Sequence, residues 1–103
     1  MQAEIQAIAN IDRTIHEPAR LAIIAVLSAA ESADFKALLH LTGLSKGNLS
    51  AQMSKLEDAG YISITKSFKG RYSHTECALT DAGRSAFRLY WRQYKALGAV
   101  IDV

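Results

Sequence analysis

The stretch Leu41–Ile62, LTGLSKGNLSAQMSKLEDAGYI, decides the fold. A helix turns about 100° per residue, so Leu49, Met53 and Leu56 fall within one sector, which we expect to pack on the body of the protein. The remaining surface of this helix is small and polar, and it carries no acid before Glu57. A helix that only faced water would be expected to carry more charged pairs. The outward face therefore indicates close approach to a large, negatively charged partner.

Local sequence signals mark where this helix and the shorter one before it begin and end. Asp34 can cap the shorter helix, and Gly43 supplies the left-handed residue that ends it. Ser45 can cap the next helix, which we expect to stop at Gly60. Two helices joined by the TGLS turn form a helix-turn-helix over about 34–59. Such a pair is also a common packing motif, so the motif alone does not establish DNA binding.

After Gly60 the hydrophobic period changes from helical to alternating. YISITKS and SHTECAL alternate as half-buried strands do, and FKGRY reads as a turn between them, which predicts a hairpin over about 61–79. The tip carries two long cations, Lys69 and Arg71, around Gly70, and these can reach a minor groove or its phosphates. A basic surface turn can also occur in a protein that does not bind DNA. A basic hairpin directly after a helix-turn-helix nevertheless favours DNA binding.

Further helices are expected on either side of these elements. A short amino-terminal helix places Ile5 and Ile8 on one edge. Pro18 suits a first helical turn, and the apolar density of the following ARLAIIAVLSAA predicts a core helix that is buried on most sides. Thr80 can cap a last helix over about 81–101.

The last helix carries more apolar and aromatic surface than one core face needs. Such a stripe indicates a second burial surface, and the expected partner is the same helix of a second copy, together with the edge of the first helix. A two-fold dimer places two recognition helices about one DNA turn apart. The alternative is that Trp91 and its neighbours fold back on the monomer. The expected interface residues are Ile5, Ile8, Leu89, Tyr90, Trp91, Tyr94 and Leu97.

Composition and charge fit this organisation. The chain has 103 residues, about one domain, and 50% of them are hydrophobic, which indicates a folded chain with a modest core. Residues 45–74 hold five basic side chains against two acids, whereas the first 44 residues hold three against five. Positive charge therefore lies in the second half. The amino-terminal residues do not resemble a secretion signal, and no apolar run is long enough to span a membrane, so we expect a cytoplasmic protein.

Catalytic and metal chemistry find no support in the sequence. On a strand, His74 and Cys77 point to opposite faces, which prevents a direct pair. The three histidines lack ligand spacing, and no phosphate-binding glycine loop or G-x-S-x-G elbow occurs. We therefore expect no enzyme activity, no metal and no cofactor. Cys77 reads most simply as a core strand residue, with a redox sensor as the alternative.

Three segments carry a resemblance to a known family. HEPARLAIIAVL, DFKALLHLTGLSKGNLSAQMSKLEDAGYI and FKGRYSHTECALTDAGR resemble the winged-helix DNA-binding domain of small prokaryotic transcriptional regulators of the ArsR and MarR kinds, over about 15–87. The resemblance implies a single domain over 1–103, mostly α with a small β-hairpin (α+β), in which a winged helix-turn-helix is flanked by amino- and carboxy-terminal dimerisation helices.

The resemblance also implies a partner and a site. The expected partners are a second copy of the chain and double-stranded DNA, with the second helix of the motif in the major groove and the wing beside it. Asn or Gln suits adenine there, and Lys suits guanine or phosphate. The expected DNA-contacting residues are Ser45, Lys46, Gly47, Asn48, Ser50, Ala51, Gln52, Ser54, Lys55, Lys69, Gly70 and Arg71.

Two departures from the family pattern leave the regulatory signal open. Metal-sensing ArsR-like proteins often carry two cysteines in the first helix of the motif, and FKALLHL has none. Many MarR-like proteins have longer flanking helices that build an effector pocket, whereas this chain has little spare length, so a small-molecule effector is left open and unidentified. We expect a repressor that occupies a promoter site. The alternative is a winged-helix adaptor that binds protein through the same surface.

Overall fold

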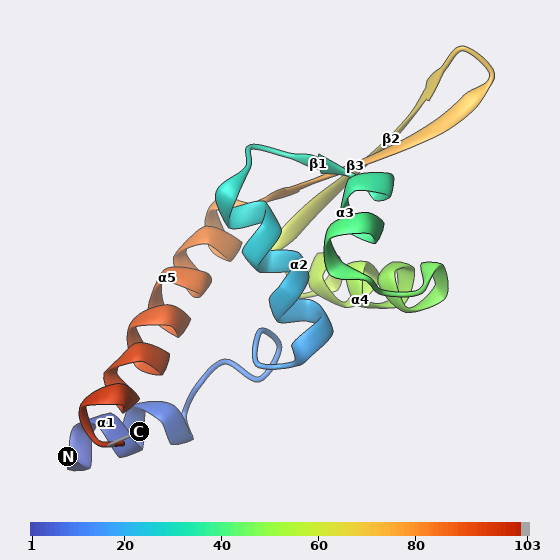
Figure 1. The fold of residues 1–103 in the computed structure, drawn as a ribbon. Coiled ribbons are helices and arrows are strands. Elements are labelled where there is room, and N and C mark those ends of the chain that lie inside the picture. Colours follow the sequence, from blue (N-terminus) through green and yellow to red (C-terminus); the bar gives the residue numbers. More distant parts are fainter. Residues whose placement is uncertain (102–103) are drawn as a thin grey trace.

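The computed structural model describes residues 1–101 and contains helices arranged around a small antiparallel sheet (Figure 1). In chain order the elements are α1 (Gln2–Ala9), α2 (Pro18–Ala29), β1 (Ala33–Asp34), α3 (Phe35–Thr42), α4 (Lys46–Asp58), β2 (Ile62–Lys69), β3 (Tyr72–Leu79), α5 (Asp81–Ala96) and the 3-10 helix η1 (Leu97–Ala99). The fold class is mostly helical with a β-hairpin, as the sequence predicts. Residues 102–103 of the predicted domain lie outside the described residues.

Side-chain caps begin the helices of the predicted motif. The Asp34 carboxylate accepts a hydrogen bond from the backbone N–H of Ala37 at 2.8 Å, which starts α3. The Ser45 hydroxyl accepts from the N–H of Asn48 at 3.2 Å, which starts α4. Gly43, between them, has a φ of 70° and closes α3 in the left-handed conformation. The predicted starts of both helices and the predicted end of α3 are therefore confirmed by their capping geometry.

The sheet has the strand order β1-β3-β2, and both pairings are antiparallel. β2 and β3 form the predicted hairpin, in which Ile64 lies opposite Cys77 and Lys69 lies opposite Tyr72. The sequence analysis missed β1, whose residue Ala33 pairs with Cys77. Two residues are too short to show an alternating pattern, so this strand has no sequence signal of its own.

The core lies where α2, α4 and the base of the sheet meet. Ile23, Ile24 and Leu27 of α2 are fully buried, as expected for a core helix. Leu49, Met53 and Leu56 of α4 are each at most 3% exposed, which confirms that this face anchors the helix. The sheet contributes Ile62 and Cys77 to the same cluster.

The start of α5 is locked to the turn that follows α4. The N–H of Thr80 donates to the carbonyl of Tyr61 at 3.0 Å, and the Thr80 hydroxyl donates to the carbonyl of Gly60 at 2.6 Å. Gly83 is buried against this turn, where a Cβ atom would lie only 2.0 Å from the Tyr61 carbonyl oxygen. A side chain at this position would force the two backbones apart.

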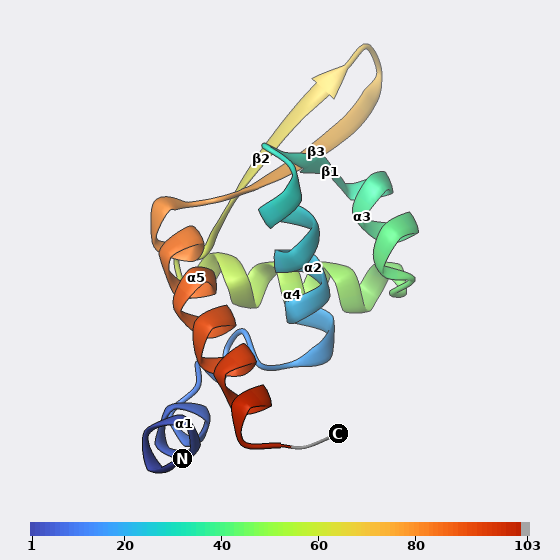
Figure 2. The same cartoon turned by 60° about the vertical axis from the view of Figure 1, so that its left-hand side comes forward.

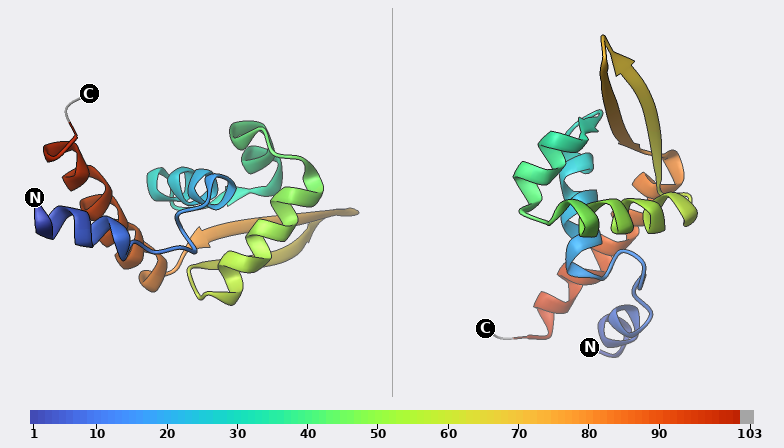
Figure 3. Two further views of the ribbon diagram at one scale, coloured as in Figure 1. Left: turned by 90° about the horizontal axis from the view of Figure 1, so that it is seen from below. Right: turned by 90° about the vertical axis from the view of Figure 1, so that its right-hand side faces the viewer.

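The molecule has two distinct ends (Figures 1 and 2). The hairpin, α3 and α4 occupy one end, and α1 packs against α5 at the other, as the views in Figure 3 show. The principal extents are 56 × 26 × 20 Å, so the chain is elongated along the line that joins these ends. A surface at one end is therefore free to meet a different partner from a surface at the other.

The last helix departs from its predicted length. The sequence predicts a helix over about 81–101, but α5 ends at Ala96 and is followed by η1. Gly98 lies in η1, and glycine disfavours the continuation of an α-helix. The apolar sequence near the carboxyl end therefore continues as the 3-10 helix η1 and not as an extension of α5.

Candidate nucleic-acid interface

The outward face of α4 is open along its length. The residues expected to meet DNA on this helix are exposed, with Gln52 the exception, and they are Ser45, Lys46, Gly47, Asn48, Ser50, Ala51, Ser54 and Lys55. Their side chains are small or end in hydrogen-bonding groups, and a Cβ atom added at Gly47 would meet nothing within 4 Å. Nothing in the described part of the chain covers this surface, so a bulky partner can approach the helix closely.

The hairpin tip projects from the same end of the molecule as α4 (Figure 1). Lys69, Gly70 and Arg71 are exposed, and Gly70 has a φ of 66°, which the tight turn between β2 and β3 requires. Two aromatic side chains flank the tip, with Phe68 77% and Tyr72 75% exposed. The tip therefore presents two cations and two uncovered rings to solvent.

Lys66 is a candidate that the sequence analysis did not include in the site. It lies on β2 in phase with Ile62 and Ile64, so it continues the core-facing side of the strand beyond the body. Together with Ser50 and Ser54 of α4 it lines a groove between the hairpin and the helix. The alternation of the strand carried the signal that could have placed this cation beside α4.

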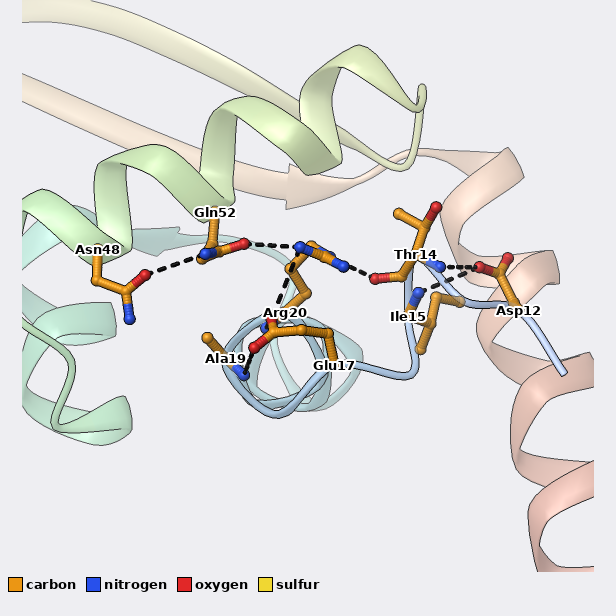
Figure 4. A network of polar contacts seen from close by, with 8 residues as sticks. All are labelled: Asp12, Thr14, Ile15, Glu17, Ala19, Arg20, Asn48 and Gln52. Carbon is orange, nitrogen blue, oxygen red and sulfur yellow. Dashed lines mark hydrogen bonds and ion pairs between the residues drawn. The ribbon is translucent and has the colours of Figure 1, made fainter.

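Gln52 is not a free contact residue. It is half-buried, and its Oε1 accepts a hydrogen bond from Nη1 of Arg20 on α2 at 2.8 Å. Its Nε2 donates to Oδ1 of Asn48 at 3.0 Å (Figure 4). The prediction that Gln52 points outward needs correction, because its amide is held between two other side chains of the protein.

Arg20 is itself held by the loop between α1 and α2. Its Nε donates to the carbonyl oxygen of Thr14, and its Nη1 lies 3.8 Å from the carboxylate of Glu17 (Figure 4). Glu17 caps α2, and its hydrogen bond from the backbone N–H of Arg20 lowers its pKa, so the carboxylate stays charged near neutral pH. No sequence pattern links Arg20 to Gln52, because the two residues are 32 positions apart.

Asp12 holds the other end of the loop between α1 and α2. Asp12 accepts hydrogen bonds from the backbone N–H groups of Thr14 at 2.8 Å and Ile15 at 3.1 Å. The hydroxyl of Tyr61 donates to the second carboxylate oxygen of Asp12, and this bond, with burial, raises the pKa of Tyr61 to about 12. The hydroxyl therefore stays protonated over the physiological range and keeps donating to the loop.

The opposite end of the molecule carries the apolar surface that the sequence predicts for a partner. Leu89, Trp91 and Tyr94 on α5 are 44–51% exposed, and Ile5 on α1 is 45% exposed. The rings of Trp91 and Tyr94 stack with centroids 6.0 Å apart. Ile8 and Leu97 are only partly buried. Most of the predicted interface residues therefore keep surface available.

Tyr90 is the exception among the predicted interface residues. It is 1% exposed, its ring stacks on Phe87, and its hydroxyl lies 2.9 Å from Nδ1 of His16. The prediction is wrong for this residue, because its position on α5 faces the body of the same chain. The alternative of a stripe folded back on the monomer therefore holds for Tyr90 and fails for Trp91.

Cys77 lies in the core, 1% exposed, as expected for a structural strand residue. Burial raises the pKa of its thiol to about 11, which keeps the reactive thiolate scarce near neutral pH. Within residues 1–101 no group of three or more His, Cys, Asp or Glu side chains is placed to hold a metal ion. In that same range no helix has both the length and the apolar character that crossing a bilayer demands.

Comparisons with known proteins agree with this geometry. Residues 19–97 match the family described as winged helix DNA-binding domain. An uncharacterized protein of Methanocaldococcus jannaschii is 38% identical over 72 residues, which cover 69% of this chain and 77% of that protein.

Solved structures of other proteins share the fold of this chain. A transcriptional regulator homologue from Pyrococcus horikoshii superimposes with a TM-score of 0.87 at 25% identity, over 98% of this chain and 99% of that one. A MarR family transcriptional regulator from Silicibacter pomeroyi has the same fold, with a TM-score of 0.64 at 20% identity over 95% of this chain and 63% of the other.

The chain belongs to the winged helix DNA-binding domain family. The family is one of DNA-binding domains and not of enzymes, and the chain shares its fold with transcriptional regulators, one of them of the MarR family. The exposed α4 surface and the adjoining hairpin correspond to the recognition helix and the wing of such a fold.

Proposed function

We propose that this protein binds specific DNA sites as a homodimer, with α4 in the major groove and the wing on the adjacent backbone or minor groove. The observation that carries this proposal is the face of α4 opposite Leu49, Met53 and Leu56. It is uncovered, free of acids as far as Leu56, and placed at the same end of the molecule as the basic tip. A helix with small side chains on that face can enter a groove about 12 Å wide.

The basic side chains around this face supply affinity that does not depend on sequence. Lys46, Lys55, Lys66, Lys69 and Arg71 are all exposed. Each cation that meets a phosphate displaces condensed counterions, so binding should weaken steeply as salt is added. The short polar side chains of α4, chiefly Asn48, then distinguish one base from another.

The dimer rests on the apolar surface of α1 and α5. Ile5, Leu89, Trp91 and Tyr94 are exposed at the end remote from α4, and an uncovered cluster of this kind is typical of a protein interface. A two-fold axis through this end leaves both recognition helices free to meet one face of DNA. A pseudo-palindromic site follows from that symmetry.

The regulatory outcome follows from occupancy. A homodimer that covers a promoter site blocks access to it, so we propose repression. The proposed unit is a single winged-helix domain over 1–103, with α1 and α5 as its dimerisation helices. An unidentified small-molecule effector remains a prediction.

Fluorescence anisotropy with labelled genomic duplexes over a salt series tests the proposal, and sequencing of the selected fragments gives the site. We expect selective binding with a strong salt dependence. Absence of DNA binding at low salt would overturn the proposal and favour the adaptor that binds protein through the same surface.

Asn48→Ala tests the role of α4 directly. The variant should lose about 1–3 kcal/mol of discrimination between the selected site and random duplex, because a base contact disappears while phosphate contacts stay. Equal losses on specific and random duplex would remove Asn48 from its assigned role. A bulky residue at Gly47 should likewise reduce discrimination, because it holds α4 away from the base edges.

A further inference from the structure

The contact chain Arg20–Gln52–Asn48 determines which end of the Asn48 amide faces outward. An amide side chain can donate through its nitrogen or accept through its oxygen, and the two ends are nearly equal in size. Which end is presented depends on the neighbours. In this molecule the neighbours form a chain that starts from a residue with only one hydrogen-bonding role (Figure 4).

Arg20 sets the direction of that chain. A guanidinium donates and never accepts, so the end of Gln52 that lies 2.8 Å from Nη1 must be the oxygen. The nitrogen of Gln52 is then turned to Asn48, where it donates at 3.0 Å. The atom of Asn48 that accepts must be Oδ1. The amide nitrogen of Asn48 is consequently turned away from Gln52, as Figure 4 shows.

Arg20 is fixed firmly enough to impose this orientation. Its side chain is only 15% exposed, and it holds the carbonyl of Thr14 and faces the Glu17 carboxylate as well as Gln52. Asn48, at the other end of the chain, is exposed. The amide that would meet DNA is therefore oriented before binding by side chains that are held within the protein, which reduces the ordering cost on binding.

We propose that Arg20 is a positioning residue for sequence reading, and that it makes the recognition helix present the two Nδ2–H donors of Asn48 to a base with acceptors on its major-groove edge. Guanine fits, because O6 and N7 are both acceptors. Adenine also requires an outward-facing Oδ1 to accept from its N6 amino group, whereas Oδ1 of Asn48 is turned toward Gln52. This inference rests on the proposed entry of α4 into the major groove, and it replaces the expectation that Asn48 reads adenine.

Gln52→Glu is the decisive variant. A glutamate still accepts from Arg20, but it cannot donate to Asn48, so the Asn48 amide should turn, donate to the new carboxylate and present Oδ1 outward. The preferred base at that position should change from guanine to adenine or cytosine, by about tenfold in relative affinity. The added negative charge lowers affinity for every sequence, so the relative preference at this position is the quantity to compare.

Arg20→Met removes the donor and should flatten the guanine preference at the same position, while preferences elsewhere in the site stay. Arg13→Met is the matched control, because Arg13 is exposed in the loop before α2 and carries the same charge. The probe is a library of randomised duplexes, selected with each variant and sequenced. Thermal melting identifies variants that fail to fold. If Arg20→Met fails to fold, Gln52→Glu alone tests the positioning role of Arg20.

The outcomes separate the two proposals. If the wild-type protein selects no sequence, the proposed function fails and this inference fails with it. If the wild type selects a site whose guanine depends on Asn48, but Gln52→Glu and Arg20→Met keep the wild-type preference, only the positioning role of Arg20 is overturned. A reversal in Gln52→Glu that disappears in the Asn48→Ala background establishes it, since general destabilisation does not invert a preference.

Discussion

The two amphipathic helices α4 and α5 are anchored alike and exposed differently. Each buries one face in the chain's own core, through Leu56 on α4 and Tyr90 on α5. The outward face of α4 carries Gly, Asn, Ser and Lys, whereas that of α5 carries Leu89, Trp91 and Tyr94 among its arginines. The same secondary structure therefore offers two different surfaces.

Under the proposed function, this difference sets how each helix meets its partner. Small polar side chains allow a close approach to DNA and leave hydrogen-bonding groups free, whereas large apolar side chains gain free energy only when another surface covers them. The distance between the two ends of the molecule lets both surfaces act at once. Substitutions on one end should therefore leave the function of the other largely intact.

The largest effect is expected on the α5 side. Leu89→Glu places a charge on the apolar surface and should dissociate the dimer, which lowers affinity for a two-fold DNA site about 100-fold or more because the bivalent contact is lost. Sedimentation measures the oligomeric state, and Trp91, the sole tryptophan, should shift its emission to longer wavelength. Leu41→Glu, at another exposed leucine, should not change sedimentation. A dimer that persists in Leu89→Glu would contradict the proposed interface.

The next effect is expected on the α4 side. Ala51→Glu puts a carboxylate on the face that meets DNA, and repulsion from the phosphates should weaken binding by about 2 kcal/mol, roughly 30-fold. Anisotropy measures the affinity, and sedimentation should show an intact dimer. Ala25→Glu makes the same change at an exposed position of α2 and should have little effect. Similar losses in both variants would show that net charge alone decides binding.

A smaller and more uniform effect is expected at the wing. Arg71→Ala should weaken binding a few-fold to all sequences and reduce the slope of log K against log salt by about 0.9, since one phosphate contact is lost. A salt titration by anisotropy gives this slope. Arg88→Ala, on the exposed side of α5, is the control and should keep the wild-type slope. A sequence-dependent loss in Arg71→Ala would instead indicate base reading by the wing.

The smallest effect is expected at Cys77. Because the pKa of its buried thiol is raised to about 11, Cys77 should react with a thiol reagent at pH 8 only as fast as the protein unfolds, and diamide should leave DNA affinity unchanged. Absorbance follows the thiol reaction, and urea provides the unfolded reference. Rapid labelling of the native protein, with loss of DNA binding on oxidation, would favour the redox sensor.

Much of the fold could be predicted from local signals. The caps at Asp34, Ser45 and Thr80 were identifiable because a short polar side chain before an apolar run offers its oxygen to a free N–H. The hairpin followed from alternation, and the anchor of α4 from helical spacing. β1 and the end of α5 were missed, because a two-residue strand and a final turn are decided by neighbours and not by periodicity.

The candidate site could be predicted only in part. The exposed positions on α4 and the wing tip were correct as surface positions, because exposure follows from the opposite, apolar face. Gln52 was misplaced because it lies at the edge of the buried face of α4, where a small rotation decides between solvent and core. Tyr90 was misplaced because the apolar stripe of α5 is wide, and the sequence does not say which part of it the body of the chain covers. Whether these surfaces bind DNA and a second copy stays a prediction for the experiments above.

By itself the sequence determined the α-helices and the hairpin, their order and the polar or apolar character of most faces, because these depend on residues a few positions apart. Only the tertiary structure decided that Arg20 reaches across to Gln52 and that Tyr90 turns inward toward His16. These contacts join residues 32 and 74 positions apart. No local pattern encodes them, because they arise when the packed core fixes where each helix lies and how it is rotated.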